Sequence, residues 1–447
     1  MKIPHATLTQ GAALTLLSFS VGNLIRLTTS IILARLLAPE LFGIMVLVFT
    51  LRTGVELLTD VGIGQNIIYN KNAEDPDFYN TAWTLRAIRG VLLWLLTCAA
   101  ALPMAHFYEK PILATIIPVA SLAIVLTGFS SLNAFLLQKR LQLANLTLYD
   151  AIFSTVSAIG QIVLAYFIPT IWGLVYGLLF AGTVALAWSY FVLPSVKYRF
   201  RLSKDYAREI LHFGKWISLT SIVYFLSISF DRFYLAGVVP LALLGVYGIS
   251  RSIADLTSGF ALQLSNSVIF PFIARHSEVP RAELRNEVTS IRHTLLLIAA
   301  LGFSVAAAFV DLAIHIVFDQ RYHAAGWMAP LLIIGGWFSI LCSLNESTLL
   351  GLGAPRYGAI AYSVKFLWLL VGLPLGINKF GPVGGIIAIA VSDIFRYPAV
   401  FFGQIQQRFA FGWQDLFATL LMLVLFAIFV WLRWMLGLGT PFDSVFS

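Results

Sequence analysis

Three short sequence patterns occur twice in this chain, in the same order and about 200 residues apart. The first pairs Leu-Ala with a later Leu-x-Gly, the second is Ser-Leu-Asn, and the third is an aromatic residue followed by glycine. The copies lie at 33–44 and 235–246, at 131–133 and 343–345, and at 172–177 and 380–385. Self-similarity in one fixed order indicates two copies of one structural unit. Two helical copies around a central site are typical of membrane transporters.

The composition excludes an ordinary soluble globule. The chain is 59% hydrophobic and 11% charged, whereas a soluble domain is roughly 45–50% apolar and about 25% charged. The net charge of +8 is interpreted as basic loops held against anionic lipid, with no nucleic-acid partner. The only cysteines, Cys98 and Cys342, both lie in apolar stretches, so no disulfide framework, metal site or cofactor is expected.

Long apolar runs predict an all-α polytopic membrane protein, because backbone groups in lipid must bond to one another within a helix. The predicted spans are 11–37, 40–63, 81–105, 112–137, 146–168, 171–194, 214–239, 241–271, 292–318, 326–351, 357–378, 382–404 and 413–436. The first is read as a retained helix and not as a cleaved signal peptide. The repeats pair span 1 with 7, 2 with 8, 4 with 10 and 6 with 12.

The repeats predict two six-helix lobes that share one orientation and are related by a pseudo-two-fold axis along the membrane normal. The predicted divisions are an N-lobe at 1–194, a basic cytoplasmic linker at 195–213, a C-lobe at 214–408, and a C-terminal helix and tail at 409–447. The thirteenth span has no counterpart in the repeat, so the chain is expected to carry one or two helices beyond the lobes.

Loop charges predict the orientation. With the N-terminus in the cytoplasm, sixteen lysines and arginines fall inside and three fall outside. The sixteen include Arg292, counted with the loop before span 9. The positive-inside rule therefore favours a cytoplasmic N-terminus in a bacterial inner membrane, with the basic linker also inside.

Ionisable residues within the spans are the candidate site, since a charge in lipid is costly and is usually retained for function. Arg52 and Glu56 lie four residues apart on one helical face, and Arg251 and Asp255 repeat that step in the other half. Such pairs bind cargo or merely neutralise each other, and the sequence leaves both readings open. Arg86 and Arg89 are interpreted as snorkelling toward headgroups.

Arginine recognises phosphate with paired hydrogen bonds and stays charged at physiological pH, so an arginine-lined cavity favours an anionic cargo such as a diphosphate-linked lipid. Two groups of candidate residues follow. Those predicted to bind substrate are Arg26, Arg52, Arg251, Lys365 and Arg396. Those predicted to couple transport to an ion are Glu56, Asp231, Asp255 and Asp393. No P-loop, HExxH or GxGxxG signature occurs, so the chain is not expected to be an enzyme.

Three segments resemble Wzx-type polysaccharide flippases. They are Ala-Arg-Leu-Leu-Ala-Pro-Glu-Leu-Phe-Gly at 34–43, Phe-Asp-Arg-Phe-Tyr-Leu-Ala-Gly at 230–237, and Leu-Leu-Gly-Leu-Gly-Ala-Pro-Arg at 349–356. The resemblance implies the multidrug/oligosaccharidyl-lipid/polysaccharide exporter fold and an undecaprenyl-diphosphate-linked glycan as cargo. Lipid II flippases of this superfamily place arginines in helices 1 and 8, which Arg26 and Arg251 match by helix.

The function expected from these observations is a flippase for a lipid-linked glycan in exopolysaccharide, capsule or O-antigen synthesis. Its expected partners are the glycan lipid, membrane lipid and the polysaccharide polymerase and chain-length machinery. Two alternatives remain: a cation-coupled multidrug exporter of the same fold, and a membrane-embedded glycan polymerase or ligase. An arginine-rich cavity disfavours the first because it repels cationic drugs, and short outer loops disfavour the second.

Overall fold

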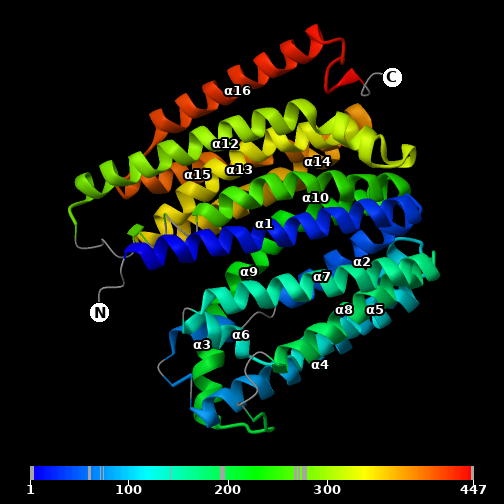
Figure 1. The fold of residues 1–447 in the computed structure, drawn as a ribbon, viewed down its shortest axis with the longest axis vertical. Helices are drawn as coiled ribbons and strands as arrows, with labels where there is room; N and C mark the ends of the chain where they lie inside the picture. The colour runs from blue at the N-terminus through cyan, green and yellow to red at the C-terminus, as the bar shows by residue number, and fades with distance from the viewer. Residues whose placement is uncertain are drawn as a thin grey trace. The chain divides into compact units, whose positions relative to one another are not determined.

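The computed structural model describes residues 5–58, 62–70, 72–73, 75–140, 142–191, 197–265, 269, 272–273 and 279–443. Within these residues the chain forms helices joined by short connections, and no strand occurs. The chain divides into two compact units (Figure 1). Unit 1 comprises 1–225 and 232–245, and unit 2 comprises 226–231 and 246–447. The lobe boundaries expected from the repeats stay a prediction.

Unit 1 is a helical bundle. Its helices are α1 (His5–Leu36), α2 (Pro39–Leu58), α3 (Ile63–Tyr69), α4 (Pro76–Phe107), α5 (Leu113–Gly128), α6 (Asn133–Lys139), α7 (Leu143–Phe167), α8 (Ile171–Phe191) and most of α9 (Lys204–Val238). Helix α7 packs between α1 and α8, and α5 packs against α4 and α8. The short helices α3 and α6 pack against each other, and α6 also packs against α7.

Unit 2 is built around α13, whose side chains are buried along most of its length. Its elements are α10 (Leu241–Leu264), from residue 246 on, α12 (Arg281–Val317), η2 (Gln320–Tyr322), α13 (Ala325–Gly351), α14 (Arg356–Ala390), α15 (Ser392–Gln406) and α16 (Gly412–Met435). Helix α13 packs against α12, α14 and α15. The indole nitrogen of Trp337 in α13, a fully buried side chain, donates to Thr419 Oγ1 in α16.

Helix α16 shows the inside-out burial expected of a lipid-embedded helix. Its polar residues Asp415 and Arg433 are buried, whereas Leu416, Phe417 and Leu420 are exposed. Arg292 Nη2 lies 2.5 Å from Asp415 Oδ1, and Arg433 Nη1 and Nη2 lie 2.5 and 2.6 Å from the two oxygens of Asp311. Ion pairs from α12 therefore anchor both ends of α16 within unit 2. In lipid, exposed apolar and buried polar side chains are the stable arrangement.

The predicted spans agree with the observed helices in place. Each of the thirteen overlaps a helix, and the break predicted between 378 and 382 falls at Gly381, whose φ of 62° and ψ of −153° interrupt α14. Among the residues that the structure describes, nine helices are long and apolar enough to cross a membrane, or ten if the bent pair of α5 and α6 forms one span. The loop predicted before span 9 was wrong in part: Arg281, Arg285 and Arg292 all lie inside α12, and Arg292 is buried.

The first sequence repeat marks a close backbone contact. A Cβ on Gly43 would lie 2.1 Å from Leu241 O, and one on Gly245 would lie 2.0 Å from Pro39 O. Both glycines thus allow the first turns of α2 and α10 to touch, and residues 241–245 belong to unit 1 with α2. Glycine is required at both positions because any side chain would occupy the partner's carbonyl oxygen.

Candidate functional site

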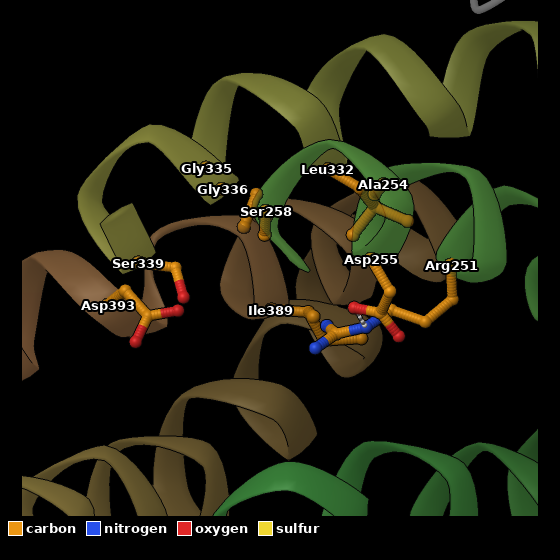
Figure 2. Close-up of a pocket in the computed structure, with 11 residues that line it drawn as sticks. Arg251, Ala254, Asp255, Ser258, Leu332, Gly335, Gly336, Ser339, Ile389 and Asp393 are labelled. Atoms are coloured by element: carbon orange, nitrogen blue, oxygen red, sulfur yellow. Dashed lines mark hydrogen bonds and ion pairs between the residues drawn. The ribbon is translucent and has the colours of Figure 1, made fainter. Parts of the chain in front are cut away.

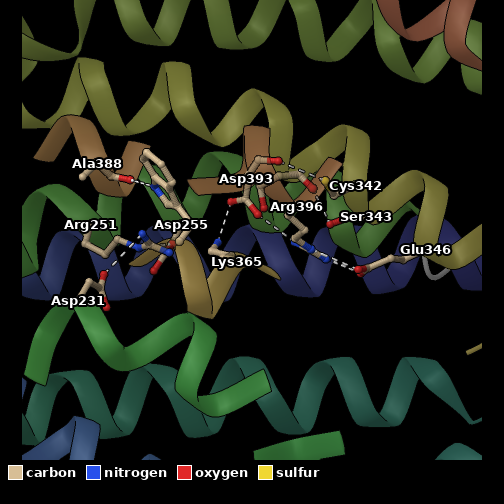
Figure 3. A network of polar contacts seen from close by, with 12 residues as sticks. Asp231, Arg251, Asp255, Cys342, Ser343, Glu346, Lys365, Ala388, Asp393 and Arg396 are labelled. Atoms are coloured by element: carbon tan, nitrogen blue, oxygen red, sulfur yellow. Dashed lines mark hydrogen bonds and ion pairs between the residues drawn. The ribbon is translucent and has the colours of Figure 1, made fainter. Parts of the chain in front are cut away.

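The predicted charged residues of the second half gather in one buried polar network in unit 2 (Figure 3). Five helices supply its members: α9, α10, α13, α14 and α15. The network contains three cations and four carboxylates: Arg251, Lys365, Arg396, Asp231, Asp255, Glu346 and Asp393. Cations thus alternate with carboxylates, as burial of charge in a low-dielectric interior requires.

Arg251 forms one end of the network. Its Nε lies 2.9 Å from Asp255 Oδ1, one helical turn further along α10, and its Nη1 lies 3.8 Å from Asp231 Oδ2 in α9. Asp231 is buried, and the hydroxyl of Tyr247 donates to the same Oδ2. Asp255 is half exposed, so it is the member of this trio in contact with solvent-accessible space.

Arg251, Asp255 and Asp393 also line a small cavity of about 50 Å³ between α10, α13 and the α14–α15 junction (Figure 2). Ser258 and Ser339 add hydroxyl groups to its wall. A cavity of this size holds a few water molecules or a small ion, and not a sugar diphosphate. In this structure the cavity is therefore large enough for a small ion or water and too small for the glycan headgroup.

Lys365 and Arg396 share Asp393 at the other end of the network. Lys365 Nζ lies 2.7 Å from Asp393 Oδ2, and Arg396 Nη1 lies 3.1 Å from Asp393 Oδ1. Arg396 also pairs with Glu346 of α13 and stacks over the Tyr362 ring at 4.0 Å. The side chains of Lys365, Asp393 and Arg396 are all more than nine-tenths buried.

Unit 1 holds the other two predicted cations in a different setting. Arg52 Nε lies 2.9 Å from Glu56 Oε1, and Arg89 of α4 donates to the Glu56 backbone oxygen. Arg26 donates to Asn23 Oδ1 at 2.5 Å and is exposed within this unit. Asp60, one turn beyond Glu56, lies outside the described residues.

Arg86 and Arg89, interpreted from sequence as snorkelling side chains, are partly buried in the bundle of unit 1. Arg86 Nη1 donates weakly to Ser131 O at 3.4 Å, and its guanidinium lies 5.8 Å from the Phe135 ring centre. These described contacts include no carboxylate. The spacing of 86 and 89 on one helical face was the sequence signal for this cluster.

Tyr247 and Tyr362 are site residues that the sequence did not single out. Each contacts a charged member of the network, Tyr247 by its hydroxyl and Tyr362 by its ring face. Their helical positions are ordinary for tyrosine in an apolar span, so only the packing of α10 on α9 and of α14 on α15 shows their role.

The helical spans, the two units and the buried ionic network define a polytopic membrane transporter of the two-lobe helical class. The chain belongs to the polysaccharide biosynthesis protein family, whose model matches residues 32–326. The chain is a multi-pass bacterial membrane protein, and its resemblance to Wzx-type flippases is confirmed.

Three curated relatives share this family character. Teichuronic acid biosynthesis protein TuaB of Bacillus subtilis (strain 168) is 23% identical over 326 residues, which is 72% of this chain and 66% of that protein. Succinoglycan biosynthesis transport protein ExoT of Rhizobium meliloti (strain 1021) is 22% identical over 388 residues, 86% and 76% of the two chains. Lipopolysaccharide biosynthesis protein WzxC of Escherichia coli (strain K12) is 22% identical over 249 residues, 55% and 50%.

Solved structures confirm the fold. Lipid II flippase MurJ in an inward closed conformation superposes with a TM-score of 0.71 at 14% identity, covering 94% of this chain and 92% of that chain. An inward-facing multidrug resistance transporter of the MATE family, in the MOP superfamily, gives 0.69 at 14% identity, with 92% and 98% covered. At this identity both matches establish architecture and not cargo.

Proposed function

We propose that this chain is a flippase that moves an undecaprenyl-diphosphate-linked glycan from the inner to the outer leaflet by alternating access. Its cargo would serve exopolysaccharide, capsule or O-antigen synthesis. The family match supports this, as do the names of three relatives, which assign those proteins to teichuronic acid, succinoglycan and lipopolysaccharide biosynthesis. Polymerase and chain-length proteins are the proposed partners downstream.

The arginine cluster of unit 1 carries the proposal. Arg52 and Arg89 both contact Glu56, and Arg86 lies one turn before Arg89 without a carboxylate among its described contacts. A partly buried guanidinium without a counter-ion is costly in a membrane span. A diphosphate would supply the missing anionic oxygens through paired hydrogen bonds.

The predicted cations take different roles in this mechanism. Arg26 and Arg52 of unit 1, and Arg251 beside the cavity of unit 2, are proposed to contact the diphosphate. Lys365 and Arg396 are buried in pairs with Asp393, so they would reach the cargo only when those pairs open. The carboxylates proposed for ion coupling are Glu56, Asp231, Asp255 and Asp393.

The proposed mechanism keeps the predicted topology. The N-terminus and the 195–213 linker lie in the cytoplasm, and the lobes at 1–194 and 214–408 rock about the bound cargo. Single cysteines at positions 204 and 320, introduced into a chain without Cys98 and Cys342, should then react with impermeant reagents from opposite sides of the membrane. Labelling of both from the outside would contradict this topology.

The decisive experiment measures surface glycan and protein abundance together in a strain that lacks the chromosomal copy. Arg26→Ala, Arg86→Ala and Arg251→Ala should each lower export, by about tenfold to a hundredfold per lost charge-assisted contact, at normal abundance. Arg→Lys should restore export only in part, because the bidentate geometry is lost. Lys110→Ala, at an exposed position, is the control.

Full export from a well-expressed Arg26→Ala/Arg251→Ala chain would refute cargo binding by these arginines. Loss of abundance in proportion to export would instead assign them a structural role.

The drug-exporter alternative is favoured by one observation only: the unit 2 network has one more carboxylate than cations. An excess carboxylate attracts cations. If that alternative holds, expression of the chain should lower accumulation of a lipophilic cationic dye, and Asp255→Asn should abolish the effect while surface glycan stays unchanged.

A further inference from the structure

The segment that precedes α9 is fixed to unit 1 as an extended strap, here defined as residues 197–203. Backbone N–H groups at alternate positions donate to one face of α4. The contacts are Arg199 N to Asn80 Oδ1 at 2.9 Å, Arg201 N to Thr84 Oγ1 at 3.1 Å, and Ser203 N to Thr81 Oγ1 at 3.1 Å. The Arg201 side chain adds an ion pair of 2.6 Å to Asp77 of the same face. These contacts fix the backbone of the strap on α4 in one orientation.

One set of strap side chains is aromatic and packs on unit 1. The Tyr198 hydroxyl donates to Asn133 Oδ1 at 2.6 Å, and its ring lies 5.5 Å from that of Trp83. Phe200 lies 5.0 Å from Trp83, yet 70% of its surface is exposed, and Leu202 is 55% exposed. Exposed apolar side chains on a fixed backbone indicate contact with something other than water.

The same segment is strongly basic. The exposed cations along the strap and the first turns of α9 are Lys197, Arg199, Arg201, Lys204 and Arg208. At alternate positions of an extended chain, Lys197 and Arg199 lie about 6.6 Å apart on one side, while Arg201 is paired with Asp77. The backbone N–H of Asp77 and the Tyr206 hydroxyl lower the pKa of the Asp75 carboxyl, so this carboxyl stays ionised and attracts Arg201 of the strap.

The length of α4 places the strap at the membrane surface. The 32 residues of α4 span about 48 Å, against a hydrocarbon core of about 30 Å. A centred helix would extend about 9 Å beyond the core at each end, so residues 77–84 cross the boundary between headgroups and acyl chains. Aromatic side chains beside lysine and arginine are the signature of that depth.

We propose that the strap and the first turns of α9 form a binding surface for anionic phospholipid of the bilayer, with the basic side chains on lipid phosphates and Phe200 and Leu202 at the acyl boundary. This role is separate from cargo transport and does not depend on the nature of the cargo.

Lipid retention tests the charges. The purified chain, exchanged from detergent into mixed phosphatidylglycerol and phosphatidylcholine and then studied by native mass spectrometry, should retain phosphatidylglycerol preferentially. Lys197→Gln/Lys204→Gln should reduce that retention about tenfold, at roughly a few-fold per basic residue. Lys110→Gln/Lys379→Gln removes the same charges at other exposed positions and should leave it unchanged. Equal retention by both variants would overturn the proposal.

A spin label at position 202 tests the depth in a chain without Cys98 and Cys342. In vesicles with 30% phosphatidylglycerol, the nitroxide should be accessible to oxygen and protected from a water-soluble nickel complex. Full accessibility to the nickel complex would overturn the proposal. Adding undecaprenyl phosphate in place of phosphatidylglycerol separates cargo from bulk lipid: retention of the former alone would also overturn it.

Discussion

The same four-residue step, an arginine followed by an acid one turn later, ends in two different environments. Arg52–Glu56 and Arg251–Asp255 have the same Nε-to-carboxylate distance of 2.9 Å. In unit 1 a further arginine, Arg89, contacts the pair through the Glu56 backbone oxygen, and Arg86 lies one turn before Arg89 in α4. In unit 2 the pair meets another carboxylate, Asp231, and lines a cavity with Asp393.

The difference shows that a local ion pair does not define a binding site. Where carboxylates surround a fully buried arginine, as Asp393 and Glu346 do at Arg396, its charge is satisfied within the protein and the structure depends on it. Arg86, whose described contacts include no carboxylate, is the better candidate to meet an outside anion. We therefore expect Arg86 of unit 1 to be more available to an anionic headgroup than the paired cations Lys365 and Arg396 of unit 2.

The largest effect is expected from breaking the unit 2 network at its shared carboxylate. Asp393→Ala leaves Lys365 and Arg396 buried without their common partner, which should cost about 3–5 kcal/mol and lower abundance sharply. Thermal unfolding in detergent and membrane abundance measure this loss.

The control variant for Asp393→Ala removes both members of the Lys365–Asp393 ion pair. Lys365→Met/Asp393→Leu leaves Arg396 paired with Glu346 and should recover most of the lost stability. A stable, abundant Asp393→Ala chain would mean that the network is hydrated and does not support unit 2.

A smaller loss is expected where the two repeats touch. Gly245→Ala places a methyl group 2.0 Å from Pro39 O and should cost roughly 1–3 kcal/mol by forcing α2 and α10 apart. Gly302→Ala, with nothing within 4 Å, should be neutral or slightly stabilising. Similar melting temperatures for the two variants would show that the close contact is not required.

The smallest effect is expected at the half-exposed acids of the repeated step. Glu56→Gln and Asp255→Asn each remove one partner of a partly solvated pair and should change stability by about 0.2–1 kcal/mol. Both changes should alter ion coupling, but the two should differ in cargo binding: Glu56→Gln makes the arginine cluster of unit 1 more positive and should strengthen it, whereas Asp255→Asn should leave it unchanged. Identical transport profiles would remove the functional distinction between the two units.

Much of the architecture could be predicted because a membrane span can be recognised from local sequence alone. Long apolar runs in lipid must form helices, and all thirteen predicted spans overlap helices. The interruption of the helix at Gly381 was also predicted correctly. The start of α12 was not predicted correctly, because Arg292 was assigned to a loop. In the structure it is buried in α12 and paired with Asp415 of α16. A polar or amphipathic extension of a helix, such as the start of α12, is assigned to a loop when helices are predicted only from apolar runs.

The sequence by itself determined the interactions within one helical turn. It placed Arg52 on Glu56 and Arg251 on Asp255, because a step of four residues returns to the same helical face. It also placed the repeated glycines at 43 and 245, although the carbonyl groups that each must admit come from another helix.

Only the tertiary structure decided which partner each buried charged side chain meets. Lys365, without an acid three or four residues away, meets Asp393 from the next helical segment 28 positions on, and Arg396 meets Glu346 from α13. Arg86, read as a snorkelling side chain, is left without a carboxylate among its described contacts. The physical reason is that a buried charge is governed by its neighbours within about 4–6 Å, and the packing of separate helices chooses those neighbours.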